Sequence, residues 1–291
     1  MSKVLLFNAT GAQGGTIASR LMEEGYEVIS PVRSAEKVAS LKERGIEGIL
    51  TDFKMESLKE IVAKADNVVL QIPAQVIPSV MVDIADNAIQ AINNAGKPDT
   101  IMVISSTIAE KETGVPSVDA RVKMVKLAKK YLPNMPILSS TEYLENFSTA
   151  YREPILNNGV IPQTIPPSSP VNYLSWSDLA SYVVAALKSN NLEGKVYPIG
   201  GNEGLTGNDL SLRLGKVLNK ELHYAPVTHE QLQGILTPIL GEEVAKDYAE
   251  FYHWQDGDGA HLLNPDTSEI REKLGVELPS FEEWAKEAFA L

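Results

Sequence analysis

The sequence predicts an α/β fold in which a doubly wound parallel sheet is combined with a smaller, mostly helical C-terminal part. Short and nearly all-apolar runs alternate with helical patterns through the first half of the chain, as expected for parallel strands buried on both faces. A glycine-rich turn joins the first of these runs to the first helical pattern. After residue 200 the pattern is mainly helical. These features together are typical of a Rossmann-type fold.

The expected strands and helices alternate from the N-terminus to about residue 147. Apolar and β-branched runs predict strands at residues 4–7, 28–32, 48–50, 67–72, 100–105 and 136–138. Helices are expected between them, including 34–43, which Ser34 can cap, and 80–93, which follows Pro78. Residues 1–150 are therefore expected to form a first domain.

The remaining residues have a different sequence pattern. Prolines crowd residues 154–170, where no regular element is expected. A helix over 177–188 and a strand over 195–199 are expected to rejoin the sheet, so that residues 175–200 complete the first domain. A capping-box pattern from Thr206 to Asp209 begins the helix-rich tail. Residues 151–291 thus form mainly the smaller part, to which we assign substrate binding.

Composition excludes several classes of protein. The absence of cysteine excludes disulfides, thiolate metal sites and a cysteine nucleophile. The net charge of -12 argues against a nucleic-acid surface. No apolar run approaches the roughly 20 residues of a membrane span, and no secretion signal is visible, so a cytoplasmic location without a membrane partner is expected. The four histidines lack metal-ligand spacing, and no metal site is predicted. The sequence leaves open whether the chain forms a homodimer.

The turn after the first strand has the spacing Asn8-x-x-Gly11-x-x-Gly14. In a strand-turn-helix context such a turn lets backbone N–H groups at the helix start bind a pyrophosphate. Asparagine replaces the usual first glycine, but it readily adopts positive φ and so makes the same turn. We interpret the loop as a dinucleotide site, with an ordinary turn as the alternative.

Cofactor choice depends on the end of the second strand. About twenty residues after the loop, NAD-binding proteins usually place an acidic residue for the ribose 2′-hydroxyl. This chain has Arg33 there, in the sequence "SPVRS". A guanidinium suits a 2′-phosphate, which favours NADP, that is NADPH, although NAD remains open. The alternative is a solvated arginine at a strand end.

Seven short motifs lie at or near the ends of these elements: "NATGAQGG", "PVRS", "TDF", "QIP", "YLENF", "YLSWSDLA" and "GKVYPIGG". With them the chain resembles the NmrA-like branch of the atypical short-chain dehydrogenase/reductases, which includes type 2 NAD(P)H quinone oxidoreductases. The resemblance implies contacts of the cofactor diphosphate with Thr10, Gly11, Gln13 and Gly14, of the ribose phosphate with Arg33, of the adenine with Asp52 and Phe53, and of the ribose and nicotinamide with Gln71 to Pro73. For Asp52 a turn or cap role is equally open.

The usual catalytic pair of short-chain dehydrogenases is missing. A Tyr-x-x-x-Lys pair places both side chains on one helix face, where the tyrosine protonates a carbonyl. Here Asp119 stands four residues before Lys123, and none of the ten tyrosines has a lysine at the required position. The resemblance implies that Lys123 contacts cofactor or substrate, with neighbouring Lys126 and an exposed helical lysine as alternatives. The resemblance also implies that Ser105, at the end of the fifth strand, lies near the nicotinamide, with ordinary strand-end capping as the alternative.

Without that acid, the most plausible hydride acceptor is a quinone or similar electrophile, a small molecule whose reduced form tolerates negative charge. A quinone requires a flat, largely apolar slot. Candidates for its walls are Tyr143, Asn146, Phe147, Tyr173, Trp176, Tyr252, His253 and Trp254, and of these Tyr143, Asn146, Trp176 and His253 are our substrate-binding predictions. A non-catalytic NAD(P)-binding redox sensor acting through a protein partner is the alternative, because the lost tyrosine supports it equally.

Overall fold

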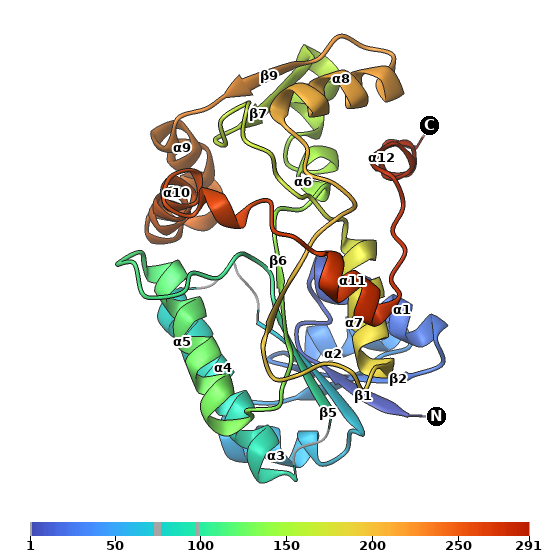
Figure 1. Cartoon of the computed structure of the whole chain (residues 1–291). Coiled ribbons are helices and arrows are strands. Elements are labelled where there is room, and N and C mark those ends of the chain that lie inside the picture. The colour runs from blue at the N-terminus through green and yellow to red at the C-terminus, as the bar shows by residue number, and fades with distance from the viewer. Residues whose placement is uncertain (1, 73–76, 97–98, 291) are drawn as a thin grey trace.

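The computed structural model describes residues 2–72, 77–96 and 99–290, and its centre is a seven-stranded sheet (Figure 1). In spatial order the strands are β3 (Glu47–Leu50), β2 (Glu27–Val32), β1 (Lys3–Leu6), β4 (Asn67–Gln71), β5 (Asp99–Ile104), β6 (Ile137–Ser140) and β8 (Val196–Ile199). All neighbouring pairs are parallel. The order reverses between β1 and β4, which is where open α/β sheets bind ligands. The predicted doubly wound fold is confirmed.

Helices cover both faces of the sheet. One layer contains α1 (Ala12–Glu23), α2 (Ala35–Glu43), α7 (Trp176–Lys188) and α11 (Ser268–Leu274), and the other contains α3 (Met55–Val62), α4 (Pro78–Asn94) and α5 (Pro116–Tyr131). Alternate residues of β1 and the residue after it enter the two cores: Val4 and Leu6 face the first layer, and Leu5 and Phe7 face the second. The period of two follows from strand geometry and explains why these runs are apolar throughout.

The predicted helix boundaries hold because local chemistry sets them. The Ser34 hydroxyl accepts a hydrogen bond from the Lys37 N–H at 3.3 Å and caps α2. Pro78 occupies the first turn of α4, where its missing N–H costs nothing. Ser175 and Asp178 form a capping box at the start of α7.

The rest of the chain forms a smaller unit above the sheet in Figure 1. It contains α6 (Glu145–Ser148), a π-helix (Pro154–Asn158), β7 (Val160–Gln163), α8 (Gly207–Leu218), β9 (His223–Pro226), α9 (His229–Leu240), α10 (Glu242–Asp256), a short 3₁₀ helix (Ala260–Leu262) and α12 (Phe281–Ala288). No helix within the described residues has the length and apolar character needed to cross a bilayer.

The expectation that residues 154–170 hold no regular element is wrong. Residues 154–158 form the π-helix, and β7 pairs in parallel with β9 as a separate two-stranded sheet. Pro154 begins the π-helix, where a proline N–H is not needed. Pro162 is tolerated because each strand of a two-stranded sheet has a free edge, at which a missing N–H breaks no ladder.

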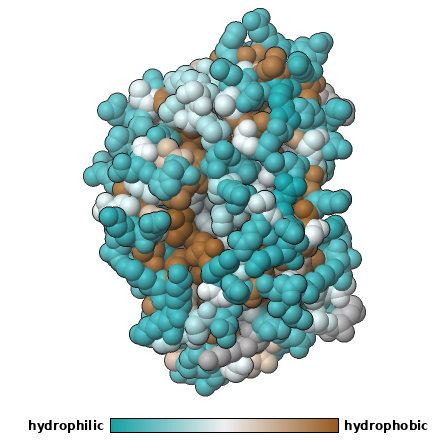
Figure 2. Space-filling model, viewed as in Figure 1, coloured by the Kyte–Doolittle hydropathy of each residue, from teal (hydrophilic) through white to brown (hydrophobic). Residues whose placement is uncertain are grey.

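Helix α10 joins the smaller unit to the sheet by packing on α5. Phe251 and Trp254 of α10 share an apolar cluster with Val118 and Val122 of α5. In the space-filling view, an apolar strip runs down the left half of the face from the level of α10 towards α5 (Figure 2). The two helices therefore close over the end of the sheet at which β5 and β6 terminate.

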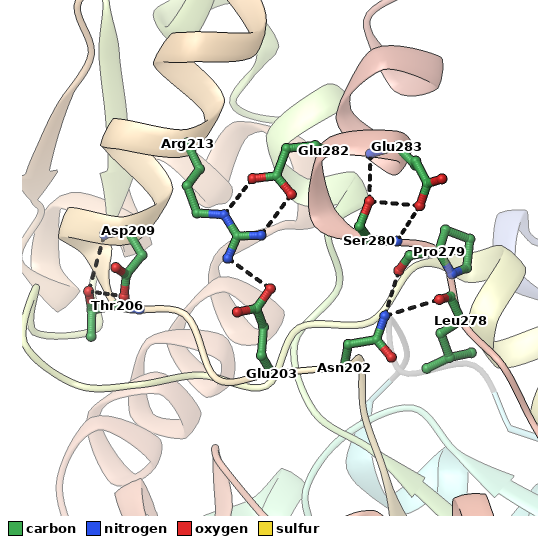
Figure 3. Close-up of polar contacts among 10 residues, drawn as sticks. All are labelled: Asn202, Glu203, Thr206, Asp209, Arg213, Leu278, Pro279, Ser280, Glu282 and Glu283. Atoms are coloured by element: carbon green, nitrogen blue, oxygen red, sulfur yellow. Dashed lines mark hydrogen bonds and ion pairs between the residues drawn. The ribbon is translucent and has the colours of Figure 1, made fainter.

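The C-terminal helix α12 is fixed to α8 by a network of ion pairs (Figure 3). The Arg213 guanidinium donates to both oxygens of Glu282, at 2.6 and 2.7 Å, and pairs with Glu203 at 2.8 Å. Such bidentate geometry is the strong form of an Arg–carboxylate pair. The capping box predicted at Thr206 and Asp209 is present at the start of α8. These contacts hold α12 over the apolar core that supports β7 and α6.

Candidate functional site

The turn between β1 and α1 has the conformation that its sequence predicts. Asn8 adopts φ 67°, in the left-handed region that few residues other than glycine enter. Its carbonyl oxygen accepts a hydrogen bond from the Gly11 N–H at 3.0 Å, which closes the turn. Gly11 then provides the extended residue before α1. Asparagine thus performs the task of the missing glycine.

Gly14 allows the helix to approach the turn. A Cβ atom at this position would lie 2.1 Å from the Asn8 carbonyl oxygen, which leaves no room for any side chain. Among the described residues no side chain caps α1, and its first turn contains no acidic residue. An uncapped helix start presents backbone N–H groups and the positive end of the helix dipole, which together favour an anion. Thr10 is exposed beside this helix start, and Gln13 lies in its first turn.

Arg44, at the end of α2, braces this loop and was not predicted. Its guanidinium donates to the carbonyl oxygens of Ala9 at 3.1 Å and Gly15 at 3.0 Å. The contact links residues 35 positions apart. An exposed arginine at a helix end carries no local sequence signal for such a role.

Arg33 and Phe53 lie together beyond the ends of β2 and β3. The Arg33 guanidinium carbon is 4.7 Å from the centroid of the Phe53 ring. Phe53 has φ 61°, which is uncommon for a bulky residue and typical of sites where the backbone is constrained for function. The structure thus brings an exposed cation and an aromatic face to one point.

Asp52 acts in the turn that precedes α3. Its carboxylate accepts the Lys54 N–H at 3.0 Å and pairs with the Lys54 ammonium group at 3.5 Å. The backbone hydrogen bond is the main reason that the pKa of Asp52 lies below its usual value. The turn role that the sequence left open is therefore present, and the adenine contact stays a prediction.

Three polar side chains meet at the carboxyl ends of β4 and β5. The Gln71 amide nitrogen donates to the Gln13 side-chain oxygen at 2.8 Å and to the Ser105 hydroxyl at 3.2 Å. The Ser105 hydroxyl donates to the same Gln13 oxygen at 2.6 Å. Gln71 is 1% exposed, and its side-chain oxygen has no hydrogen-bond partner among the described residues. Pro73, also predicted to border the nicotinamide, lies outside the described residues.

A cavity of about 170 Å³ lies beside this network, between the sheet, α5 and α10. Its walls come from the helix start, the ends of β5 and β6, α5, α7 and α10. The lining residues are Gln13, Ser105, Ser106, Ser117, Arg121, Thr141, Glu142, Tyr143, Asn146, Trp176, Asp247, Tyr248, Phe251 and Tyr252. The structure thus brings three of the four predicted substrate-binding residues, Tyr143, Asn146 and Trp176, to one cavity.

Sequence reasoning missed three charged side chains of this cavity, Arg121, Glu142 and Asp247. Arg121 is 5% exposed; it donates to the Ser117 carbonyl oxygen at 2.8 Å, and its guanidinium carbon lies 4.6 Å from the Phe251 ring centroid. Burial lowers its pKa. Glu142 is 7% exposed, and burial raises its pKa to about 7, partly offset by a hydrogen bond from Gln255. The available signal for Glu142 was a charged residue two positions after a buried strand.

Tyr143 stands next to Glu142 and faces the end of β5. Its hydroxyl is 2.8 Å from the Ser140 hydroxyl. Burial is the main cause of a Tyr143 pKa raised to about 12, so this phenol keeps its proton at neutral pH. It is thus a hydrogen-bonding group of the cavity wall with a strong hold on its proton.

The predicted catalytic Lys123 lies elsewhere. It is exposed on α5 and is not among the residues that line the cavity. The alternative, Lys126, pairs with Glu112 at 2.8 Å on the same exposed side. Asp119 accepts the Thr113 N–H at 2.6 Å and orders the loop before α5. A contact of either lysine with cofactor or substrate stays a prediction that this geometry does not support.

His253 is also outside the cavity lining. It is exposed on α10, and its ring makes an edge contact with His229, with the ring centroids 5.0 Å apart. His229 in turn lies 2.9 Å from the Asp256 carboxylate. The described residues contain no group of three or more acidic or histidine side chains arranged to hold a metal.

Comparison with known proteins identifies the family. The sequence model of the NmrA-like family matches residues 1–285. The chain belongs to the NmrA-like family. The resemblance inferred from its motifs is therefore confirmed.

Curated relatives of this NmrA-like protein are photosystem II assembly factors. Ycf39 of Synechocystis is 27% identical over 206 residues, which cover 69% of this chain and 63% of that protein. Ycf39 of Cyanophora paradoxa is 25% identical over 256 residues, which cover 86% of this chain and 76% of that protein. This chain thus matches less than two thirds of the length of the Synechocystis protein.

Solved structures with a similar fold include reductases and epimerases. Triphenylmethane reductase of Citrobacter, solved with NADP(H), matches with a TM-score of 0.79 and 20% identity over 98% of this chain and 99% of that chain. The quinone oxidoreductase QOR2 of Escherichia coli, solved with NADPH, matches with a TM-score of 0.79 and 19% identity over the same shares. At this identity the likeness shows the fold.

Proposed function

We propose that this protein is an NADP(H)-dependent reductase that transfers hydride to a small planar electrophile such as a single-ring quinone. The observation that carries the proposal is that Gln13 and Ser105 belong both to the polar network at the phosphate loop and to the cavity wall. A ligand in the cavity would adjoin the cofactor end of the loop. We further propose that residues 1–150, completed by 175–200, bind the cofactor and that residues 151–291 contribute mainly the substrate side.

The residues at the loop fit such a cofactor. The uncapped start of α1 and the close approach at Gly14 suit a pyrophosphate. The Gln71 amide nitrogen holds the Gln13 and Ser105 side chains together at the cavity edge, where the nicotinamide end of the cofactor would lie. The exposed Arg33 suits a 2′-phosphate, so NADPH is preferred, with NAD as the weaker alternative. The bound cofactor would supply the hydride.

The cavity limits the size of the acceptor. Its volume is about 170 Å³, and an apolar cavity of about 150 Å³ is large enough for benzene. Aromatic walls from Tyr143, Trp176, Phe251 and Tyr252 favour a flat ring. We therefore propose a single-ring acceptor in place of a polycyclic one.

Turnover tests the proposed reaction. The purified protein is mixed with NADPH and single-ring or polycyclic quinones while the absorbance of the reduced nicotinamide is followed. We expect catalytic oxidation of NADPH with single-ring quinones and slower oxidation with polycyclic ones. Binding of NADPH without turnover of any acceptor would contradict the reductase proposal.

Replacement of Arg33 by alanine tests cofactor choice. We expect the affinity for NADPH to fall by about 10-fold or more, because a charge-assisted hydrogen bond to the 2′-phosphate is lost. The affinity for NADH, which lacks that phosphate, should be unchanged. Dissociation constants from nicotinamide fluorescence provide both values. Equal affinities of the unmodified protein for the two cofactors, unchanged in Arg33→Ala, would refute the role.

A second candidate function is a redox sensor that binds NADP(H) and acts through a protein partner. The observation in its favour is that the curated relatives are named as assembly factors. NADPH binding without turnover in the experiment above would favour it. The expected cytoplasmic location rests on the sequence alone.

A further inference from the structure

Glu142 is a buried carboxyl on the wall of the cavity. It lies two residues after the end of β6, at the same edge of the sheet as Ser105. One carboxylate oxygen accepts the Asn146 side-chain N–H at 3.2 Å, and the other accepts the Gln255 side-chain N–H at 3.1 Å. These bonds orient the group while it remains part of the cavity surface.

Charged and hydroxyl side chains of the helices packed against Glu142 influence its pKa. Arg121 of α5 lowers the pKa of Glu142, as does the Tyr252 hydroxyl of α10, and Asp256 raises it. Loss of water outweighs these contributions, so the pKa of about 7 leaves a large protonated fraction at neutral pH. The Glu142 charge also interacts with five tyrosines, Tyr143, Tyr151, Tyr173, Tyr224 and Tyr248. Asp247 lies near Arg121.

We propose that Glu142 is the acid that protonates the reduced acceptor. This inference rests on the proposed reductase function. Hydride addition to a quinone leaves a hydroquinone monoanion. The O–H bond of the Glu142 carboxyl then breaks, the proton forms a new O–H bond on the anionic oxygen, and the resulting carboxylate takes a proton from water. The balance is one quinone, one NADPH and one solvent proton consumed, with one hydroquinone and one NADP⁺ formed.

An acid supplied by the protein extends the range of acceptors that the cavity can reduce. The missing Tyr-x-x-x-Lys pair indicates an acceptor that needs no protein proton donor, and the position of Glu142 removes that restriction. Single-ring conjugated ketones, whose reduction leaves an enolate that needs a proton, become substrates of the same cavity. Their reduction should depend on Glu142 more strongly than that of quinones, because an enolate is the more basic anion.

A matched control for Glu142 lies three residues further along the chain. Burial raises the pKa of Glu145 to about 7 as well. Its carboxylate accepts the Trp176 backbone N–H at 3.0 Å, and it does not line the cavity. Glu145→Gln therefore removes a similar buried acid without removing one from the cavity wall.

Infrared titration of the cofactor-free protein tests the acid directly. In Glu145→Gln we expect a protonated-carboxyl band that disappears as the pH rises through about 7, and that shifts when a single-ring hydroquinone is added. The band should be missing in the double variant Glu142→Gln/Glu145→Gln, whereas Glu142→Gln alone keeps the band of Glu145, whose pKa is also about 7. The proposal would be overturned if Glu142 lost its proton near the ordinary pKa of a glutamate, or if the band did not shift when the hydroquinone was added. Circular dichroism of each variant checks its fold.

Single-turnover kinetics with NADPH provide the second test. We expect Glu142→Gln to slow reduction of a conjugated ketone by about 100-fold and to remove the decline in rate at alkaline pH. Glu142→Asp should retain that decline, and Glu145→Gln should match the unmodified protein. If the unmodified protein reduces acceptors and Glu142→Gln keeps both the rate and the pH profile, the role of Glu142 as the acid is refuted and the reductase function stands. Absence of turnover in the unmodified protein would refute the reductase function and the protonation step with it, whereas the infrared titration separately decides whether Glu142 holds a proton at neutral pH.

Discussion

Gly14→Ala is expected to abolish useful binding of NADPH, with a loss of affinity of about 100-fold, the equivalent of about 3 kcal/mol of strain. The added Cβ would lie 2.1 Å from the Asn8 carbonyl oxygen, a backbone atom that cannot move without opening the turn. The same oxygen accepts the Gly11 N–H, so the displacement would spread through the loop. Nicotinamide fluorescence measures the dissociation constant.

Gly15→Ala is the matched control. A Cβ at Gly15 would meet only the end of the flexible Arg44 side chain, at 3.0 Å. A shift of the guanidinium weakens its hydrogen bonds to Ala9 and Gly15 but leaves the Asn8–Gly11 turn closed. Alanine is also the better helix former by about 1 kcal/mol. We expect this variant to bind NADPH nearly as well as the unmodified protein and to unfold at a similar or higher temperature. Equal losses of affinity in both variants would show that Gly14 has no special role.

The stability of the protein is expected to fall as the pH rises through neutrality. Burial raises the pKa values of Glu142 and Glu145 to about 7 from an ordinary value of 4.5. A carboxyl with a raised folded-state pKa contributes stability that is complete below its unfolded pKa and is lost as the pH rises through its folded pKa. Above its folded-state pKa, each group would lower the free energy of unfolding by about 3 kcal/mol, because one unit of pKa difference corresponds to about 1.4 kcal/mol.

Urea unfolding at a series of pH values measures this effect. The free energy of unfolding should decline from about pH 5 to about pH 8, and less steeply in Glu142→Gln and Glu145→Gln. Exposed carboxylates with lowered pKa values, such as Asp66 and Glu283, act at lower pH and in the opposite direction. A stability that is flat over the neutral range, or variants that keep the full slope, would mean that neither group is buried as described.

The fold was predictable because local sequence patterns determine it. Buried parallel strands appear as apolar runs, and Ser34 and Pro78 mark helix starts through contacts within one turn. The conformation of Asn8 followed from its intrinsic preference for positive φ. The strand β7 was missed because its partner, β9, lies some 60 residues later in the sequence, and because prolines ordinarily break strands.

The cavity was only partly predictable because it depends on packing between distant segments. Arg121 and Lys123 are two residues apart on α5, and such positions point to different sides of a helix. Which side meets the cavity is decided by α10, whose Phe251 packs over Arg121. The raised pKa of Glu142 likewise comes from burial between distant segments, one of which contributes Gln255, 113 residues away. No local pattern reports either contact.

The most direct test of the account is a titration of the purified, folded full chain with NADPH and NADH, followed by fluorescence of the nicotinamide. The account predicts saturable binding of one NADPH per chain, tighter than that of NADH, through the backbone of the loop from Asn8 to Gly14. Failure of both cofactors to bind the folded protein would contradict it.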